Sequence, residues 1–77
     1  MDNVTVALVD TRGNTIAHSS GRFLEHPRTA RNGFPRWSIV LIDGVMEVVE
    51  FRRMESLFYV SDDQALIEEA KAVLPVR

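Results

Sequence analysis

Arginine and aromatic side chains are interleaved between residues 22 and 37. The guanidinium group is a planar fork of donors that pairs with carboxylate or phosphate oxygens, and aromatic rings stack on bases or on guanidinium planes. The mixture therefore suits an acidic protein surface or a nucleic-acid backbone as partner. The residues that we predict to contact a partner are Arg22, Arg28, Arg31, Phe34, Arg36 and Trp37.

A plainer interpretation of the same stretch stands beside this one. The arginines would then only solvate a loop, while Phe23, Phe34 and Trp37 fill the edge of the core. Between the two partner classes, a protein with an acidic surface is favoured over nucleic acid, because the net charge of −2 is not typical of a nucleic-acid-binding protein. Interfaces between proteins also concentrate their binding energy in arginine and aromatic residues.

Catalytic chemistry has weaker support. His26 lies among Arg22, Arg28 and Arg31, which suggests a small ribonuclease as an alternative. No second acid or nucleophile follows at a recognisable spacing, and a pI near 5.6 is low for an enzyme that grips RNA. The two histidines have no metal-ligand spacing, and the four glycines do not form a phosphate-binding pattern. We therefore expect a protein that is not an enzyme and has no cofactor or metal.

Acidic residues gather in the second half of the chain. Residues 1–37 carry five arginines and three acids, whereas residues 38–77 carry four basic residues and eight acids. If the acids share one face, they could imitate a line of phosphates; alternatively, they form a solvated face and complement a helix dipole. The sequence leaves open whether this face is functional. Its members are Glu47, Glu50, Glu55, Asp62, Asp63, Glu68 and Glu69.

The size of the chain predicts a single domain over residues 1–77. A chain this short buries only roughly 60% of the surface that it exposes when unfolded. Without cysteine it can form neither a disulfide nor a thiolate metal site, so a homodimer is the most available source of further stability. No apolar run is long enough to span a membrane, and the absence of cysteine suits a cytoplasmic setting.

The first half of the chain predicts a hairpin and a loop. Residues 3–9 alternate as a strand does, and the turn at residues 10–14 returns the chain into a strand at residues 15–19. Ile16 is the only large apolar residue of this second strand, which indicates an edge strand open to a partner chain or a second copy. Residues 20–36 show no period and predict a long basic loop.

The second half predicts three strands and a helix. Residues 37–43 are apolar on both faces, as in a strand covered on both sides, and Asp43-Gly44 indicates a hairpin to a strand at residues 45–52. A helix over residues 45–56 is the alternative there. A short strand at residues 57–60 precedes an amphipathic helix, which begins at Ser61 with a capping box to Gln64 and ends before Pro75.

Together these elements predict an α+β fold. Two hairpins and a short strand form a small antiparallel sheet, in the order ββ-loop-βββ-α, with the C-terminal helix packed on it. A tiny, cysteine-free, acidic α+β domain without a catalytic motif resembles, as a class, phage-encoded inhibitors, including anti-CRISPR proteins. The resemblance implies a viral or mobile-element protein that inhibits or adapts another protein, and it carries no site residues.

Overall fold

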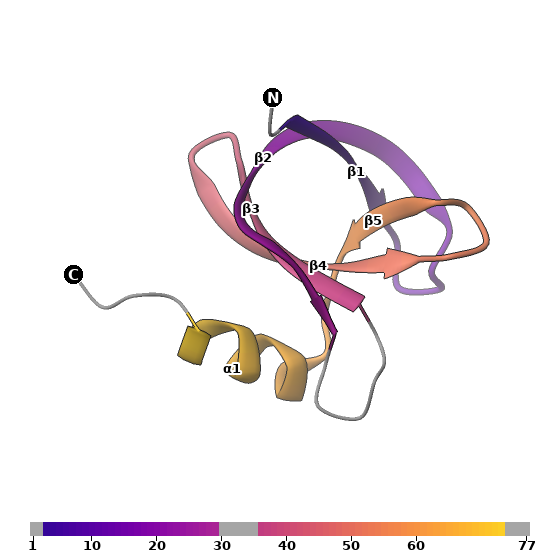
Figure 1. Cartoon of the computed structure of the whole chain (residues 1–77). Helices are drawn as coiled ribbons and strands as arrows, with labels where there is room; N and C mark the ends of the chain where they lie inside the picture. Colours follow the sequence, from indigo (N-terminus) through magenta and orange to yellow (C-terminus); the bar gives the residue numbers. More distant parts are fainter. Residues whose placement is uncertain (1–2, 30–35, 74–77) are drawn as a thin grey trace.

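The computed structural model describes residues 3–29 and 36–73, which form five strands and one helix. Figure 1 shows the strands curved into a ring, with the helix outside it. The elements are β1 (Asn3–Val9), β2 (Thr15–Thr29), β3 (Arg36–Ile42), β4 (Val45–Arg52), β5 (Leu57–Val60) and α1 (Gln64–Val73).

The sheet closes into a barrel, so the predicted small open sheet is wrong. Each strand pairs antiparallel with the next, and β5 returns to pair with β1 in parallel, where Val6 lies opposite Phe58 and Ala7 opposite Tyr59. In a five-stranded meander the first and last strands run in the same direction, so they can close the sheet only as a parallel pair. The alternation within each strand carries no information about that contact.

The predicted loop at residues 20–36 is also wrong, because residues 20–29 continue β2. This strand changes partners along its length: Arg22 is the last residue paired with β1 and the first paired with β3. The register with β3 shifts at two places between Phe23 and Arg28, and such irregularities bend a strand and let it absorb a proline. The bends also erase the period that identifies a strand in a sequence.

Gly21 lies at the point where β2 turns from β1 toward β3. A Cβ atom there would lie 3.1 Å from Cγ1 of Ile42 and 3.3 Å from the carbonyl oxygen of Leu41. Glycine therefore permits the close approach of β2 to the end of β3.

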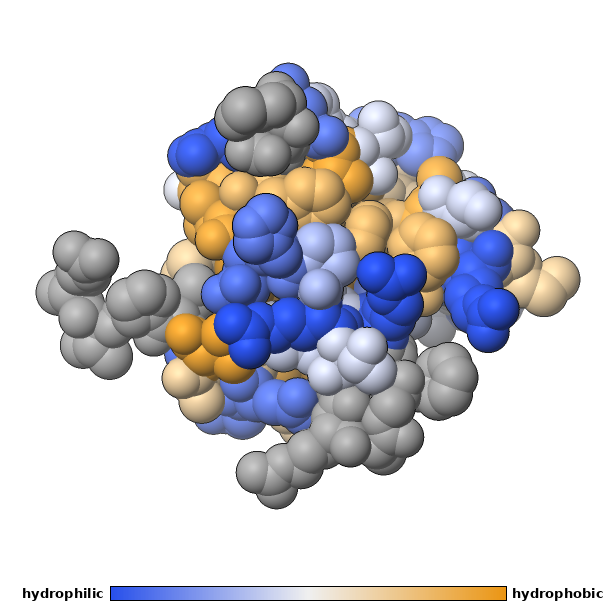
Figure 2. Space-filling model, in the orientation of Figure 1, coloured by the Kyte–Doolittle hydropathy of each residue, from blue (hydrophilic) through white to orange (hydrophobic). Residues whose placement is uncertain are grey.

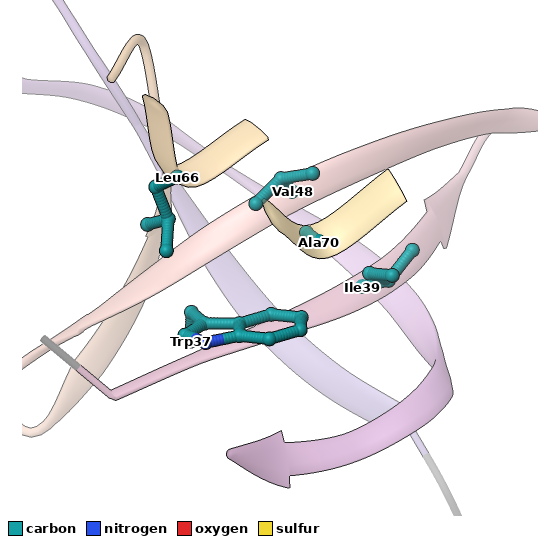
Figure 3. Packing of buried hydrophobic residues seen from close by; sticks show 5 residues of the cluster. All are labelled: Trp37, Ile39, Val48, Leu66 and Ala70. Carbon is teal, nitrogen blue, oxygen red and sulfur yellow. The ribbon is translucent and has the colours of Figure 1, made fainter. Parts of the chain in front are cut away.

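Hydrophobic residues of β3 and β4 face both sides of the barrel wall. Inside the barrel, Val40 and Val49 pack with Val6 and Ile42, and Phe23 and Phe58 lie against them. Outside, α1 covers a second cluster, shown in Figure 3, which contains Trp37, Ile39, Val48, Leu66 and Ala70. The prediction that the strand after residue 36 is covered on both sides is confirmed.

The helix is capped by Asp63 and not, as predicted, by Ser61. Oδ1 of Asp63 accepts hydrogen bonds from the backbone N–H groups of Ala65 at 3.0 Å and Leu66 at 3.2 Å. Ser61 is turned toward β4, where its hydroxyl donates to Oε2 of Glu50 at 2.6 Å. The helix consequently begins at Gln64, three residues later than predicted.

The turn between β3 and β4 explains why residues 45–52 form a strand. Asp43 and Gly44 both have positive φ, 50° and 79°, as a two-residue hairpin turn requires. The hairpin pairs Ile42 with Val45 and continues to Trp37 and Glu50. The strand prediction is confirmed, and the alternative helix over residues 45–56 is wrong.

Candidate functional site

The structure separates the predicted contact residues. Arg22, Arg28 and Arg36 are exposed on β2 and β3, whereas Trp37 is only 1% exposed and belongs to the core beneath α1. Trp37 thus fills the core, as the plainer interpretation holds, and offers no surface to a partner. The other two predicted contacts, Arg31 and Phe34, lie outside the described residues.

Arg28 and Arg36 lie together at one end of the β2–β3 ladder. In the register Arg28 is opposite Trp37 and Thr29 is opposite Arg36, so the two arginines are diagonal neighbours that leave opposite faces of the sheet. Arg22 lies six residues earlier on β2, opposite Leu41, beyond the two register shifts. We call Arg28, Arg36 and the exposed His26 the basic end.

The two arginines of the basic end are held differently. Nη2 of Arg28 lies 3.4 Å from Oε1 of Glu25, but its side chain is 49% exposed, so this pair is a weak surface contact. Cζ of Arg36 lies 5.7 Å from the ring centroid of Phe51. Phe51 in turn contacts Phe58 with ring centroids 5.1 Å apart. Arg36 therefore rests on an aromatic cluster at an end of the barrel, an arrangement that favours one orientation of its guanidinium group.

The surface over β2 carries both hydrophilic and hydrophobic residues. In Figure 2 strongly hydrophilic residues lie across the middle of the face, with hydrophobic residues mainly above them. Leu24, between Arg22 and the basic end, is 38% exposed.

A second feature is a cleft of about 610 Å³ that sequence reasoning missed. It lies where the β1–β2 turn meets the connection from β5 to α1. Its residues come from separate parts of the chain, and none of them stands in a recognisable motif. They are Leu8, Val9, Asp10, Thr11, Arg12, Gly13, Glu47, Arg52, Tyr59, Val60, Ser61 and Asp62.

Arg52 joins the two sides of the cleft. Its Nη1 donates to the carbonyl oxygen of Gly13 at 2.9 Å, its Cζ lies 4.5 Å from the ring centroid of Tyr59, and its Nε lies 3.6 Å from Oε1 of Glu55. These contacts tie the β1–β2 turn to β4 and β5. Arg52 therefore acts first as a structural clamp.

The phenol of Tyr59 has a raised pKa. Burial raises the pKa of the Tyr59 phenol, and the neighbouring Glu50 carboxylate raises it further, while Arg52 opposes the shift. Glu50 also accepts the hydroxyl hydrogen bond of Ser61, whose oxygen accepts the N–H of Asp63 at 3.1 Å. The Ser61 hydroxyl thus has two partners and is nearly buried, so this network supports structure and not nucleophilic chemistry.

The acidic residues do not form one line of charge. Glu50, Glu55 and Asp63 are engaged within the fold, with Ser61, Arg52 and the helix N-terminus respectively. Glu47 and Asp62 line the cleft, while Glu68 and Glu69 lie on α1. Because these acidic side chains are spread over different parts of the fold, they give little support to the idea that they imitate a line of phosphates.

The histidines do not meet. His18 and His26 both lie on β2, eight residues apart, on either side of the point where the strand turns from β1 toward β3. In residues 3–29 and 36–73, no three side chains of histidine, cysteine, aspartate or glutamate come together as a group that could hold a metal ion. Over the same ranges, no helix is both long and apolar enough to cross a membrane.

Comparisons of the chain with protein-family models, with curated proteins and with solved structures found no match.

Proposed function

We propose that this protein is a non-catalytic protein-binding module, an inhibitor or adaptor of the phage-encoded type, that contacts an acidic partner through its basic end. The observation that carries the proposal is that Arg28 and Arg36 are both exposed at the same end of the β2–β3 ladder, where they leave opposite faces of the sheet. Arg31 and Phe34, which lie between them in the sequence, belong to the proposed contact as well. We place its action in the cytoplasm, which the cysteine-free composition suits.

The geometry of Arg36 supports a role in recognition. Arginine in an interface loses side-chain entropy when it is ordered, and a guanidinium group already resting on Phe51 has less to lose. Arginine is among the residue types that most often dominate the binding energy of an interface. Arg28 can exchange its solvent-exposed partner Glu25 for a carboxylate of the partner at little cost.

A protein partner is favoured over nucleic acid by the distribution of charge. Arg22 lies apart from the basic end along β2. Fewer arginines can therefore contact one nucleic-acid backbone together than the predicted loop over residues 20–36 would allow. Nucleic-acid affinity depends on the number of phosphates that are neutralised together. The net charge of −2 adds repulsion over the rest of the surface.

The proposal is tested by affinity capture from a native lysate. The baits are the wild type, the double variant Arg28→Ala/Arg36→Ala, and a matched control, Arg12→Ala/Arg53→Ala, whose arginines are exposed in the β1–β2 and β4–β5 turns. We expect wild type and control to retain the same protein, and the double variant to lose at least about 90% of it, since two interface arginines together contribute about 2 kcal/mol or more.

Capture that is equal for all three baits would contradict the proposal. So would capture that disappears after nuclease treatment, together with a gel shift of generic DNA or RNA at low salt, because these results identify nucleic acid as the ligand. Release of radioactive fragments from RNA, abolished in His26→Ala, would instead establish the ribonuclease alternative. Circular dichroism of each variant checks that the domain remains folded.

A further inference from the structure

The cleft beside the β1–β2 turn exists because β1 and β5 separate at one end of the barrel. Their parallel pairing covers two pairs of residues, and the last is Ala7 opposite Tyr59. Beyond Ala7, β1 runs on into the turn at residues 10–14. On the other side Val60 follows β4, where it lies opposite Val49. The cleft therefore opens between diverging strands, and residues of both strands line it.

Apolar side chains and a half-buried carboxylate meet in this cleft. Leu8, Val9 and Val60 line it and are all half-buried. Glu47, also half-buried, lies opposite Val40, whose side chain is in the barrel core. Because residues directly opposite each other in a sheet point to the same face, Glu47 is directed toward the interior side of the wall. A group bound here meets hydrocarbon and a partly enclosed carboxylate together.

The charge of the cleft is predominantly negative. Its lining contains three acids and two arginines. Within residues 3–29 and 36–73, neither Glu47 nor Asp62 forms a salt bridge. Arg52, in contrast, already pairs with Glu55 and donates to the carbonyl oxygen of Gly13. A ligand thus meets two carboxylates without a cation of their own and one arginine that is already engaged.

We propose that this cleft binds an alkyl cation, namely the side chain of a lysine or arginine of a partner protein. The methylene stem would lie along Leu8, Val9 and Val60, with the charged head against the carboxylates of Glu47 and Asp62. Lysine and arginine side chains bury their stems on apolar surface in this way, and their heads pair strongly with carboxylates. This contact goes beyond the one at the basic end and does not depend on it.

An anion fits the same cleft less well. Arg12 is exposed on the turn, and Arg52 is held by Gly13 and the ring of Tyr59. An anion beside these arginines would also face the acids of the lining, which repel it. The contacts of Arg52 instead hold the turn against β4 and β5, so the cleft is formed before a ligand arrives, as binding sites usually are.

Nuclear magnetic resonance titrations of the full chain test the proposal. The probes are the blocked tripeptides acetyl-Gly-Arg-Gly-amide and acetyl-Gly-Lys-Gly-amide, with acetyl-Gly-Glu-Gly-amide as the anionic control. We expect at least one cationic peptide to shift the backbone amide signals of Gly13, Val60 and Asp62 with a Kd on the order of 1 mM, as one buried side chain supplies. The acidic peptide should leave these signals in place.

Two double variants separate a local contact from the net charge. Glu47→Gln/Asp62→Asn should raise the Kd about tenfold, because each lost ion pair contributes up to about fivefold. The matched control, Asp43→Asn/Glu68→Gln, removes the same charge from exposed residues outside the cleft and should leave the Kd within about twofold. The dispersion of each spectrum checks that the variant is folded.

Three results would overturn the proposal. The first is the absence of shifts at the cleft amides up to about 10 mM of either cationic peptide. The second is an equal rise of the Kd in the two double variants, which would make the binding a general charge effect. The third is tighter binding of the acidic peptide, which would make the cleft an anion site centred on Arg12 and Arg52.

Discussion

The hydrogen bond between Ser61 and Glu50 provides a sharp test of how α1 is attached to the barrel. In Ser61→Ala the Glu50 carboxylate loses a donor at 2.6 Å, and the N–H of Asp63 loses its acceptor. A hydrogen bond to a charged group contributes about 1.5–3 kcal/mol. We therefore expect Ser61→Ala to lower the free energy of unfolding by about 2 kcal/mol and the Tm by about 10 °C.

A double-mutant cycle separates this bond from the capping role that the sequence predicted for Ser61. Glu50→Gln converts the bond to a neutral one of about 1 kcal/mol, so Ser61→Ala should cost about 1 kcal/mol less in that background. If Ser61 only capped the helix, the two changes would be additive. Urea unfolding of the two single variants and the double variant gives the coupling energy.

Asp63→Ala is the matched control for the cycle. Removing a cap that accepts two backbone N–H groups should cost about 1 kcal/mol. That cost should be the same in the wild-type and Glu50→Gln backgrounds, because Asp63 is not bonded to Glu50 through its side chain. A coupling between Ser61 and Glu50 of less than about 0.3 kcal/mol would refute the assignment of Ser61 as the link between α1 and β4.

Three further predictions concern other parts of the fold. Gly21→Ala should lower the free energy of unfolding by about 1–3 kcal/mol in a urea titration, because its Cβ would crowd Ile42. Ser56→Gly should raise the same free energy by up to about 1 kcal/mol, since Ser56 has a φ of 55° that glycine adopts without strain. The third is a pH effect: because the pKa of Tyr59 is raised, the unfolded chain ionises first, so the free energy of unfolding should fall as pH rises above about 10. Tyr59→Phe should make that fall shallower in urea titrations at successive pH values.

Local features of the fold could be predicted from the sequence alone. The alternation of residues 3–9, the Asp43-Gly44 turn and the apolar stripe of α1 each depend on neighbours a few residues apart. Their physical causes, the strand period, positive φ in a tight turn and the helical repeat, act within that distance. These elements are present within two or three residues of where the sequence places them.

The tertiary structure decided the rest. Closure of the barrel depends on the parallel contact of β1 with β5, and the extension of β2 depends on a second partner strand that replaces β1 after Gly21. Ser61 donates to Glu50 because β5 delivers it beside β4, so the capping role passed to Asp63.

The candidate site was also predicted from the sequence only in part. Residue types alone suggested arginine as the group of the proposed contact, since guanidinium chemistry does not depend on the fold. Only the register of β2 with β3 separated Arg22 from Arg28 and Arg36, and only packing against α1 took Trp37 out of the surface. Pairing between distant segments sets which side chains are neighbours, and a single sequence contains no local signal of that pairing.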